Sequence, residues 1–119
     1  DKFWPGKVSL VFKAQKRVPD NLTAMTAKIG IRLPGHPVAA ALAEKVGRPI
    51  TGTSANLSGQ PGCSRIEDLA AGVLECVDMI LDAGPLKGGI GSTLVDVTQN
   101  PPLVLREGEV SAMHINRLM

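Results

Sequence analysis

Aromatic side chains are scarce in this sequence: tyrosine is absent, and aromatic residues make up only 3% of the chain. Proteins that bind single-stranded nucleic acid without sequence preference stack the bases on aromatic rings, and such a surface is not predicted here. Long apolar runs are also lacking, since no stretch approaches the roughly 20 residues that a membrane-spanning helix needs. We therefore expect a soluble, cytoplasmic protein with no membrane partner.

Cysteine and histidine are few. Cys63 and Cys76 are the only cysteines, they form no Cys-x-x-Cys pair, and the two histidines lie far from both in sequence. This spacing matches no metal-binding template, so we predict no structural metal, a reduced compartment and two cysteines that serve as packing residues. No Ser/His/Asp or Cys/His arrangement is evident, so no catalytic nucleophile is assigned. Any chemistry would come from positioning and charge neutralisation.

The net charge is only +2, but the charges are unevenly distributed. Residues 1–59 contain nine Lys/Arg and three Asp/Glu, whereas residues 60–119 contain four Lys/Arg and eight Asp/Glu. A basic half is typical of proteins with anionic partners, such as nucleotides or nucleic acid. Composition alone favours the alternative, which is scattered, solvated surface charge.

Hydrophobic periodicity predicts an α/β (α+β) fold, in which a mixed twisted open sheet is flanked by helices. Strands are predicted at residues 8–12, 29–33, 49–53, 78–82, 93–97 and 103–106, with a turn at residues 19–21. Helices are predicted at residues 37–46, at residues 65–77 with Ser64 as N-cap, and at residues 111–119. No repeat or linker interrupts the sequence, so we expect a single domain, residues 1–119.

The segment TGTSANLSG, residues 51–59, is uncharged and rich in hydroxyl groups. In an extended segment Ser54 and Asn56 project to the same side, where a hydroxyl and a carboxamide can bind a nucleotide or a carboxylate. Gly52 leaves room for a ligand to approach the backbone. An Asx-turn loop that caps the sheet is an equally good interpretation of this spacing.

The segment LKGGIGST, residues 86–93, resembles a phosphate-binding nest, because its glycines let successive backbone N–H groups point inward beside Ser92. It is not a Walker A loop, since the Lys-Ser/Thr ending is missing and a strand follows. A glycine-rich turn between two strands is the simpler alternative.

Two arginines close apolar strands. Arg32 lies at the end of the segment IGIRL, residues 29–33, and Arg106 ends the segment LVLR. Burying a guanidinium is costly unless it meets an anion, so Arg32 is a candidate for binding a carboxylate and Arg106 for binding a phosphate. The alternative for each is a surface arginine that donates to loop carbonyls.

Together these motifs resemble the YrdC/Sua5 family of threonylcarbamoyl-AMP synthases. The matching segments, in chain order, are FWPG at residues 3–6, IGIRLPGHP at 29–37, TSANLSGQP at 53–61, DMILDAG at 78–84, GGIGSTLVD at 88–96 and LREGEV at 105–110. Several motifs in one order form a specific signal, although no single one suffices.

The resemblance implies that L-threonine, bicarbonate and ATP, with Mg²⁺ as the companion of the triphosphate, become threonylcarbamoyl-AMP and pyrophosphate. A downstream threonylcarbamoyl-transfer complex would then modify adenosine 37 of tRNA. By resemblance the ATP-binding residues are Lys28, Ser54, Asn56, Gly62 and Arg106, and the threonine-binding residues are Arg32, Gly52 and Ser92. Gly62 stands where many family members have serine.

The family also carries a Lys-x-Arg motif upstream of its FWPG-like segment, and this sequence has none. We therefore expect the chain to be the C-terminal two-thirds of the family domain. Alternatives that stay open are the related carbamoyl-adenylate domain of the hydrogenase maturation protein HypF, a module that binds tRNA or double-stranded RNA without turnover, and a relative that keeps the fold for partner contacts only.

Overall fold

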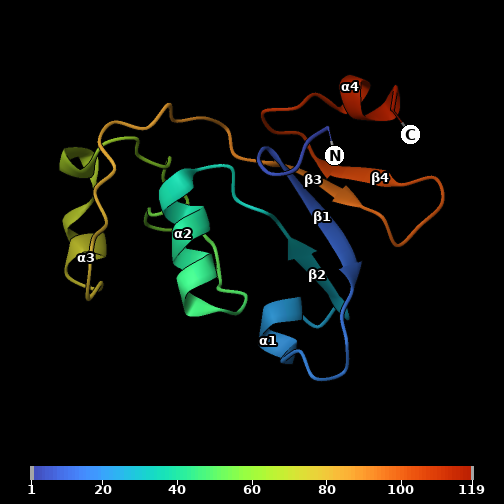
Figure 1. Ribbon diagram of the computed structural model, residues 1–119, viewed down its shortest axis with the longest axis horizontal. Helices are drawn as coiled ribbons and strands as arrows, with labels where there is room; N and C mark the ends of the chain where they lie inside the picture. The colour runs from blue at the N-terminus through green and yellow to red at the C-terminus, as the bar shows by residue number, and fades with distance from the viewer. Residues whose placement is uncertain (1, 119) are drawn as a thin grey trace. The chain divides into compact units, whose positions relative to one another are not determined.

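A four-stranded mixed sheet organises the described part of the chain, residues 2–118 of the computed structural model (Figure 1). Its strands are β1 (Val8–Lys13), β2 (Lys28–Ile31), β3 (Thr93–Asp96) and β4 (Leu103–Arg106), and their order across the sheet is β2-β1-β3-β4. The pairs β1/β2 and β3/β4 are antiparallel, whereas β1/β3 is parallel. The predicted fold class, a mixed open sheet with helices, is confirmed.

The helices are short except for one. The structure contains α1 (Asp20–Thr23), α2 (Pro37–Val46), the 3₁₀ turn η1 (Ile66–Asp68), α3 (Ala71–Leu74) and α4 (Ala112–Asn116). The bounds of α2 are those predicted, and it ends where Gly47 takes a left-handed φ of 67°. Ser111 caps α4, because its side chain accepts a hydrogen bond from the backbone N–H of His114.

The core lies on one face of the sheet. Val8 of β1 and Val95 of β3 are 2% exposed, and they pack with Val110 and with Ile115 of α4. Since side chains alternate along a strand, the residues between them belong to the opposite face. The sheet therefore has an apolar face covered by the C-terminal segment and a second face that is free to carry polar groups.

Two predicted strands do not form. Residues 49–53 and 78–82 contain no strand, so the sheet has four strands rather than six. A short apolar run becomes a strand only when another strand supplies hydrogen-bonding partners along its edge, and neither run has one among the described residues.

The predicted length of the helix at residues 65–77 is also wrong. It breaks into η1 and α3, because Leu69 and Ala70 between them have extended backbones with ψ of 131° and 137°. Ser64 is not its N-cap; η1 begins after Arg65, which makes no side-chain capping bond. The turn predicted at residues 19–21 continues as the single-turn helix α1, and the predicted C-terminal helix ends at Asn116, three residues before Met119, which lies outside the described residues.

The chain divides into two compact units. Unit 1 consists of Asp1–Ala41 and Ile90–Met119, and it contains the whole sheet and the core. Unit 2, Leu42–Gly89, contains η1 and α3. The expectation of a single domain stays a prediction. Within residues 2–118, every helix falls short of the length and apolarity needed to cross a membrane.

Candidate substrate-binding site

The free face of the sheet in unit 1 collects polar side chains from all four strands. Lys13 of β1 lies opposite Lys28 of β2, Val11 lies opposite Asp96 of β3, and Leu94 lies opposite Arg106 of β4. These register partners are on the face away from Val8 and Val95. Strand pairing thus brings Lys28 and Arg106 to the same face. Sequence motifs alone predict that both bind ATP.

Ser92 lies at the edge of this face, just before β3. Its hydroxyl shares a hydrogen bond of 2.8 Å with the hydroxyl of Ser9 from β1, and its carbonyl oxygen accepts a bond of 2.9 Å from Nη2 of Arg106. A guanidinium has five N–H donors, so Arg106 keeps further donors for an anion. A hydroxyl and a cation therefore stand side by side at the ends of two neighbouring strands.

A glycine-rich segment leads along the chain to this corner. Gly88 and Gly91 have φ of 67° and 84°, and Gly89 has φ of 139°, values that residues with a side chain rarely adopt. A Cβ at Gly91 would lie 3.8 Å from Nη2 of Arg106, so the absent side chain leaves the backbone close to the guanidinium. Residues 78–82 form no strand, so the alternative of a glycine-rich turn between two strands is wrong, and the phosphate-binding nest stays a prediction.

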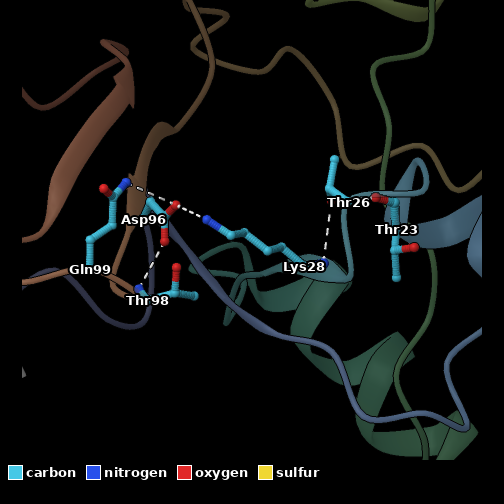
Figure 2. Close-up of polar contacts among 6 residues, drawn as sticks. All are labelled: Thr23, Thr26, Lys28, Asp96, Thr98 and Gln99. Atoms are coloured by element: carbon cyan, nitrogen blue, oxygen red, sulfur yellow. Dashed lines mark hydrogen bonds and ion pairs between the residues drawn. The ribbon is translucent and has the colours of Figure 1, made fainter.

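Lys28 has a partner that the sequence motifs did not reveal. Its Nζ donates to Oδ2 of Asp96 at 2.7 Å, and the Asp96 side chain is only 3% exposed (Figure 2). The backbone N–H of Thr98 and Nε2 of Gln99 also donate to this carboxylate, at 2.8 and 3.3 Å. The hydrogen bonds from Lys28 and then from Thr98 hold the pKa of Asp96 well below its usual range.

Arg32 follows β2 and is exposed. Among residues 2–118, no carboxylate forms an ion pair with it. A guanidinium without a protein carboxylate nearby is available to one supplied by a ligand. The proposed clamp for a carboxylate is therefore compatible with its surroundings, and the assignment stays a prediction.

Unit 2 carries the other predicted residues. Nδ2 of Asn56 donates to the carbonyl oxygens of Leu57 and Gln60, at 3.0 and 2.8 Å, and so closes a local turn. These bonds are donated by Nδ2, whereas an Asx turn requires Oδ1 to accept from a backbone N–H, so the loop does not form the Asx turn of the alternative interpretation. Within the described residues, Oδ1 of Asn56 is buried and accepts no hydrogen bond. One buried acceptor is thus left for a donor from elsewhere.

Open space surrounds the two glycines of this loop region. A Cβ built on Gly52 or on Gly62 would meet no atom within 4 Å, and neither residue has a positive φ. The structure therefore gives no packing or backbone reason for glycine at these positions. Room for a ligand, predicted for Gly52 from sequence, stays a prediction.

The eight predicted residues form two groups, each described within its own unit. Unit 1 contains Lys28, Arg32, Ser92 and Arg106, and unit 2 contains Gly52, Ser54, Asn56 and Gly62. The first group lies on or beside one sheet. Sequence reasoning missed Asp96 and Ser9, although an aspartate ending the apolar strand TLVD was a visible signal for the former.

The two cysteines differ in burial. Cys63 is half-buried, with Sγ 3.9 Å from the carbonyl oxygen of Ala55, whereas Cys76 is exposed, so the packing role predicted for Cys76 is wrong. In the described part of the chain no three His, Cys, Asp or Glu side chains group together as metal ligands.

Glycines beside backbone N–H groups, together with arginine side chains, are features of sites that bind anionic groups. A family model described as "Telomere recombination", for the Sua5/YciO/YrdC group, matches residues 1–108. The chain belongs to this family, in agreement with the resemblance drawn from its motifs.

Individual relatives agree. The chain is 33% identical over 118 residues to a threonylcarbamoyl-AMP synthase of Pyrococcus abyssi, covering 99% of this chain and 35% of the relative. It is 34% identical over 122 residues to the synthase of Bacillus subtilis, covering 99% and 34%. The crystal structure of Pyrococcus abyssi Sua5 complexed with L-threonine superposes with a TM-score of 0.87 at 32% identity, covering 99% and 35%. The chain thus spans about a third of the length of these relatives.

Proposed function

We propose that this chain supplies binding residues of an L-threonylcarbamoyl-AMP synthase, an enzyme of the nucleotidyltransferase type. The observation that carries the proposal is the contact between Nη2 of Arg106 and the carbonyl oxygen of Ser92, at 2.9 Å. This contact holds a cation that can bind phosphate beside a hydroxyl that can bind threonine or its carbamate. Relatives of the chain are named as such synthases.

The reaction needs no protein nucleophile. The amine of L-threonine adds to CO₂ derived from bicarbonate and loses a proton, which gives a carbamate. A carbamate oxygen then attacks the α-phosphorus of ATP, the bond to the β-phosphate oxygen breaks, and pyrophosphate leaves with the electron pair. Two anions must be held together against their repulsion, so cations and hydrogen-bond donors do the work.

The residues divide accordingly. Arg32 binds the threonine carboxylate, Ser92 binds threonine or its carbamate, and Arg106 neutralises phosphate charge. By the family resemblance, the hydroxyl of Ser54 and the carboxamide of Asn56 contact ATP. Gly52 lines the threonine pocket, and Lys28 and Gly62 lie along the nucleotide.

Mg²⁺ would enter with ATP. The donors gathered on the sheet face are a guanidinium, an ammonium and hydroxyl groups, which suit phosphate rather than a metal ion, and Asp96 is already paired with Lys28. The ion would therefore be held by triphosphate oxygens. The product would pass to a complex that transfers threonylcarbamoyl to adenosine 37 of tRNA, in the cytoplasm.

The test is pyrophosphate release from ATP, measured with and without L-threonine and bicarbonate. It is run on the 119-residue chain and on the same chain extended upstream by the matching segment of a relative. Release from either form that requires both co-substrates supports the proposal. If neither form releases pyrophosphate, or if release is indifferent to threonine, the proposal is overturned.

RNA binding is the second candidate. The observation that favours it is an exposed basic cluster, in which Lys13 ends β1 and Lys16 and Arg17 follow in the next loop. Such a cluster binds the phosphate backbone, so the affinity for double-stranded RNA would fall steeply with salt. Salt-dependent RNA binding without any threonine-dependent use of ATP would favour this function over the synthase.

A further inference from the structure

Thr93 is the most completely buried polar residue of unit 1, with 0% of its surface exposed. Its hydroxyl donates to the carbonyl oxygen of Val110. It also accepts hydrogen bonds from the backbone N–H groups of Gly108 and Val110, at 3.0 and 3.2 Å. A threonine hydroxyl has one donor and two acceptor positions, so all of its hydrogen-bonding capacity is used.

These bonds fasten the segment after β4 to the start of β3. The backbone N–H of Glu109 adds a bond of 2.9 Å to the carbonyl oxygen of Gly91. The approach is so close that a Cβ on Gly108 would lie 2.5 Å from the carbonyl carbon of Ser92 and 2.6 Å from the nitrogen of Thr93. Only glycine fits there. We call residues 108–110, held in this way, the clamp segment.

The clamp segment and the candidate site lie on opposite faces of the same two strands. Thr93 pairs with Val8 and points to the core face, whereas Arg106 pairs with Leu94 and belongs to the free face. Arg106 is two residues before Gly108, and Ser92 directly precedes Thr93. The position of both site residues therefore depends on how tightly the two backbones are held together behind them.

We infer that Thr93 is a positioning residue for the phosphate-binding corner: its buried hydroxyl sets the distance between Arg106 and Ser92. The inference rests on the proposed function, in which Arg106 binds phosphate. Thr93 itself touches no ligand. Without its hydroxyl, three buried backbone groups lose their partner and can regain hydrogen bonds only by moving toward water, which would carry the clamp segment and Arg106 away from Ser92.

The decisive variants are Thr93→Val, which keeps the shape and removes the hydroxyl, and Thr93→Ser, which keeps the hydroxyl. Ile115→Val, in the same core, is the control for a general loss of stability. In the form that binds ATP, Thr93→Val should weaken ATP affinity about tenfold to a hundredfold, the range for losing a hydrogen bond to a charged ligand. Thr93→Ser and Ile115→Val should bind ATP like the unmodified protein. ATP affinity unchanged in Thr93→Val overturns the inference.

A second readout does not depend on ATP. The side-chain NMR signals of Arg106, identified by their loss in Arg106→Lys, should report a guanidinium held by Ser92 in the unmodified protein and a freely rotating one in Thr93→Val. If the protein does not bind ATP, the proposed function fails and this readout alone decides the inference. If Thr93→Val does not fold, hydrogen exchange of the unmodified protein decides. The amides of Gly108 and Val110 should be as protected as those of β3, and rapid exchange overturns the inference.

Discussion

At the scale of single residues, Asp96 is the most informative side chain. It ends an apolar strand, is 2% exposed, and is held by donors from Lys28, Thr98 and Gln99. The Lys28 side chain is 37% exposed, but the carboxylate is buried, so removing Lys28 would leave a buried charge without its partner. The position of Lys28 on the sheet is thus tied to a carboxylate 68 residues further along the chain.

Lys28→Met should therefore lower the free energy of unfolding near neutral pH. Because the pKa of Asp96 is depressed in the folded state, its contribution is complete above the unfolded pKa of about 4 and is lost as pH falls below it. The difference between the unmodified chain and Lys28→Met should accordingly shrink below about pH 4. Urea unfolding measured from pH 7 to pH 3 checks this.

Lys7→Met is the matched control. Lys7 pairs with Glu109 at 3.1 Å, but both side chains are well exposed, at 65% and 38%. An exposed pair contributes roughly 0–1 kcal/mol. If the two variants lose the same free energy of unfolding at pH 7, the Lys28–Asp96 pair has no special role in stability.

Arg32 allows a test of ligand assignment. If its guanidinium binds the threonine carboxylate, Arg32→Ala should raise the threonine concentration needed for half-maximal pyrophosphate release at least tenfold. The ATP concentration needed for half-maximal release should change much less. The comparison variant is Arg17→Ala, which removes an exposed arginine from the loop after β1. Equal effects on threonine and ATP would contradict the assignment.

At the scale of elements, the N-terminal FWPG segment is held against the end of β2. The backbone N–H of Gly6 donates to the carbonyl oxygen of Leu33 at 2.9 Å, and a Cβ on Gly35 would lie 3.0 Å from the Cα of Gly6. Two motifs that the sequence presents separately, FWPG and IGIRLPGHP, are therefore neighbours. Glycine at position 35 is needed because backbone approaches backbone there.

Gly35→Ala should destabilise unit 1 by roughly 1–3 kcal/mol, since the neighbouring main chain must move to admit the methyl group. Gly52→Ala is the control, because its Cβ would meet no atom within 4 Å and its φ is not positive. That change should leave stability the same or raise it by about 0.4–1 kcal/mol. Thermal or urea unfolding of both variants is the measurement, and a Gly35→Ala chain as stable as Gly52→Ala would refute the argument.

Elements were predictable where local pattern and tertiary pairing agree. Three strands and one helix have the expected positions: β1, β3, β4 and α2. In the strands β-branched residues alternate, in the helix an Ala-rich pattern repeats with helical spacing, and proline and glycine mark where the segments end. Residues 49–53 and 78–82 carry a similar apolar pattern and form no strand. A pattern of apolar residues states a preference, whereas the strand itself requires an edge to pair with.

At the scale of the whole molecule, the sheet is made by distant segments. β1 and β3 pair in parallel although 79 residues separate Lys13 from Thr93 in the sequence, and unit 1 is built from both ends of the chain. Unit 2 is the intervening segment. The chain also spans about a third of the length of relatives from Pyrococcus abyssi and Bacillus subtilis, so its activity is a property to be tested with and without added upstream sequence.

The sequence by itself determined the family and the positions of β1, β3, β4 and α2, whereas the chemical types of the candidate ligands stay predictions. Motif order, glycines at left-handed positions and arginines after apolar runs are local properties, and local backbone sterics and side-chain chemistry are enough to interpret them. Only the tertiary structure decided that Lys28 meets Asp96, that Ser9 meets Ser92, and that Thr93 fastens the segment behind Arg106. Each of these contacts joins residues whose proximity depends on strand order and register, which no local pattern encodes.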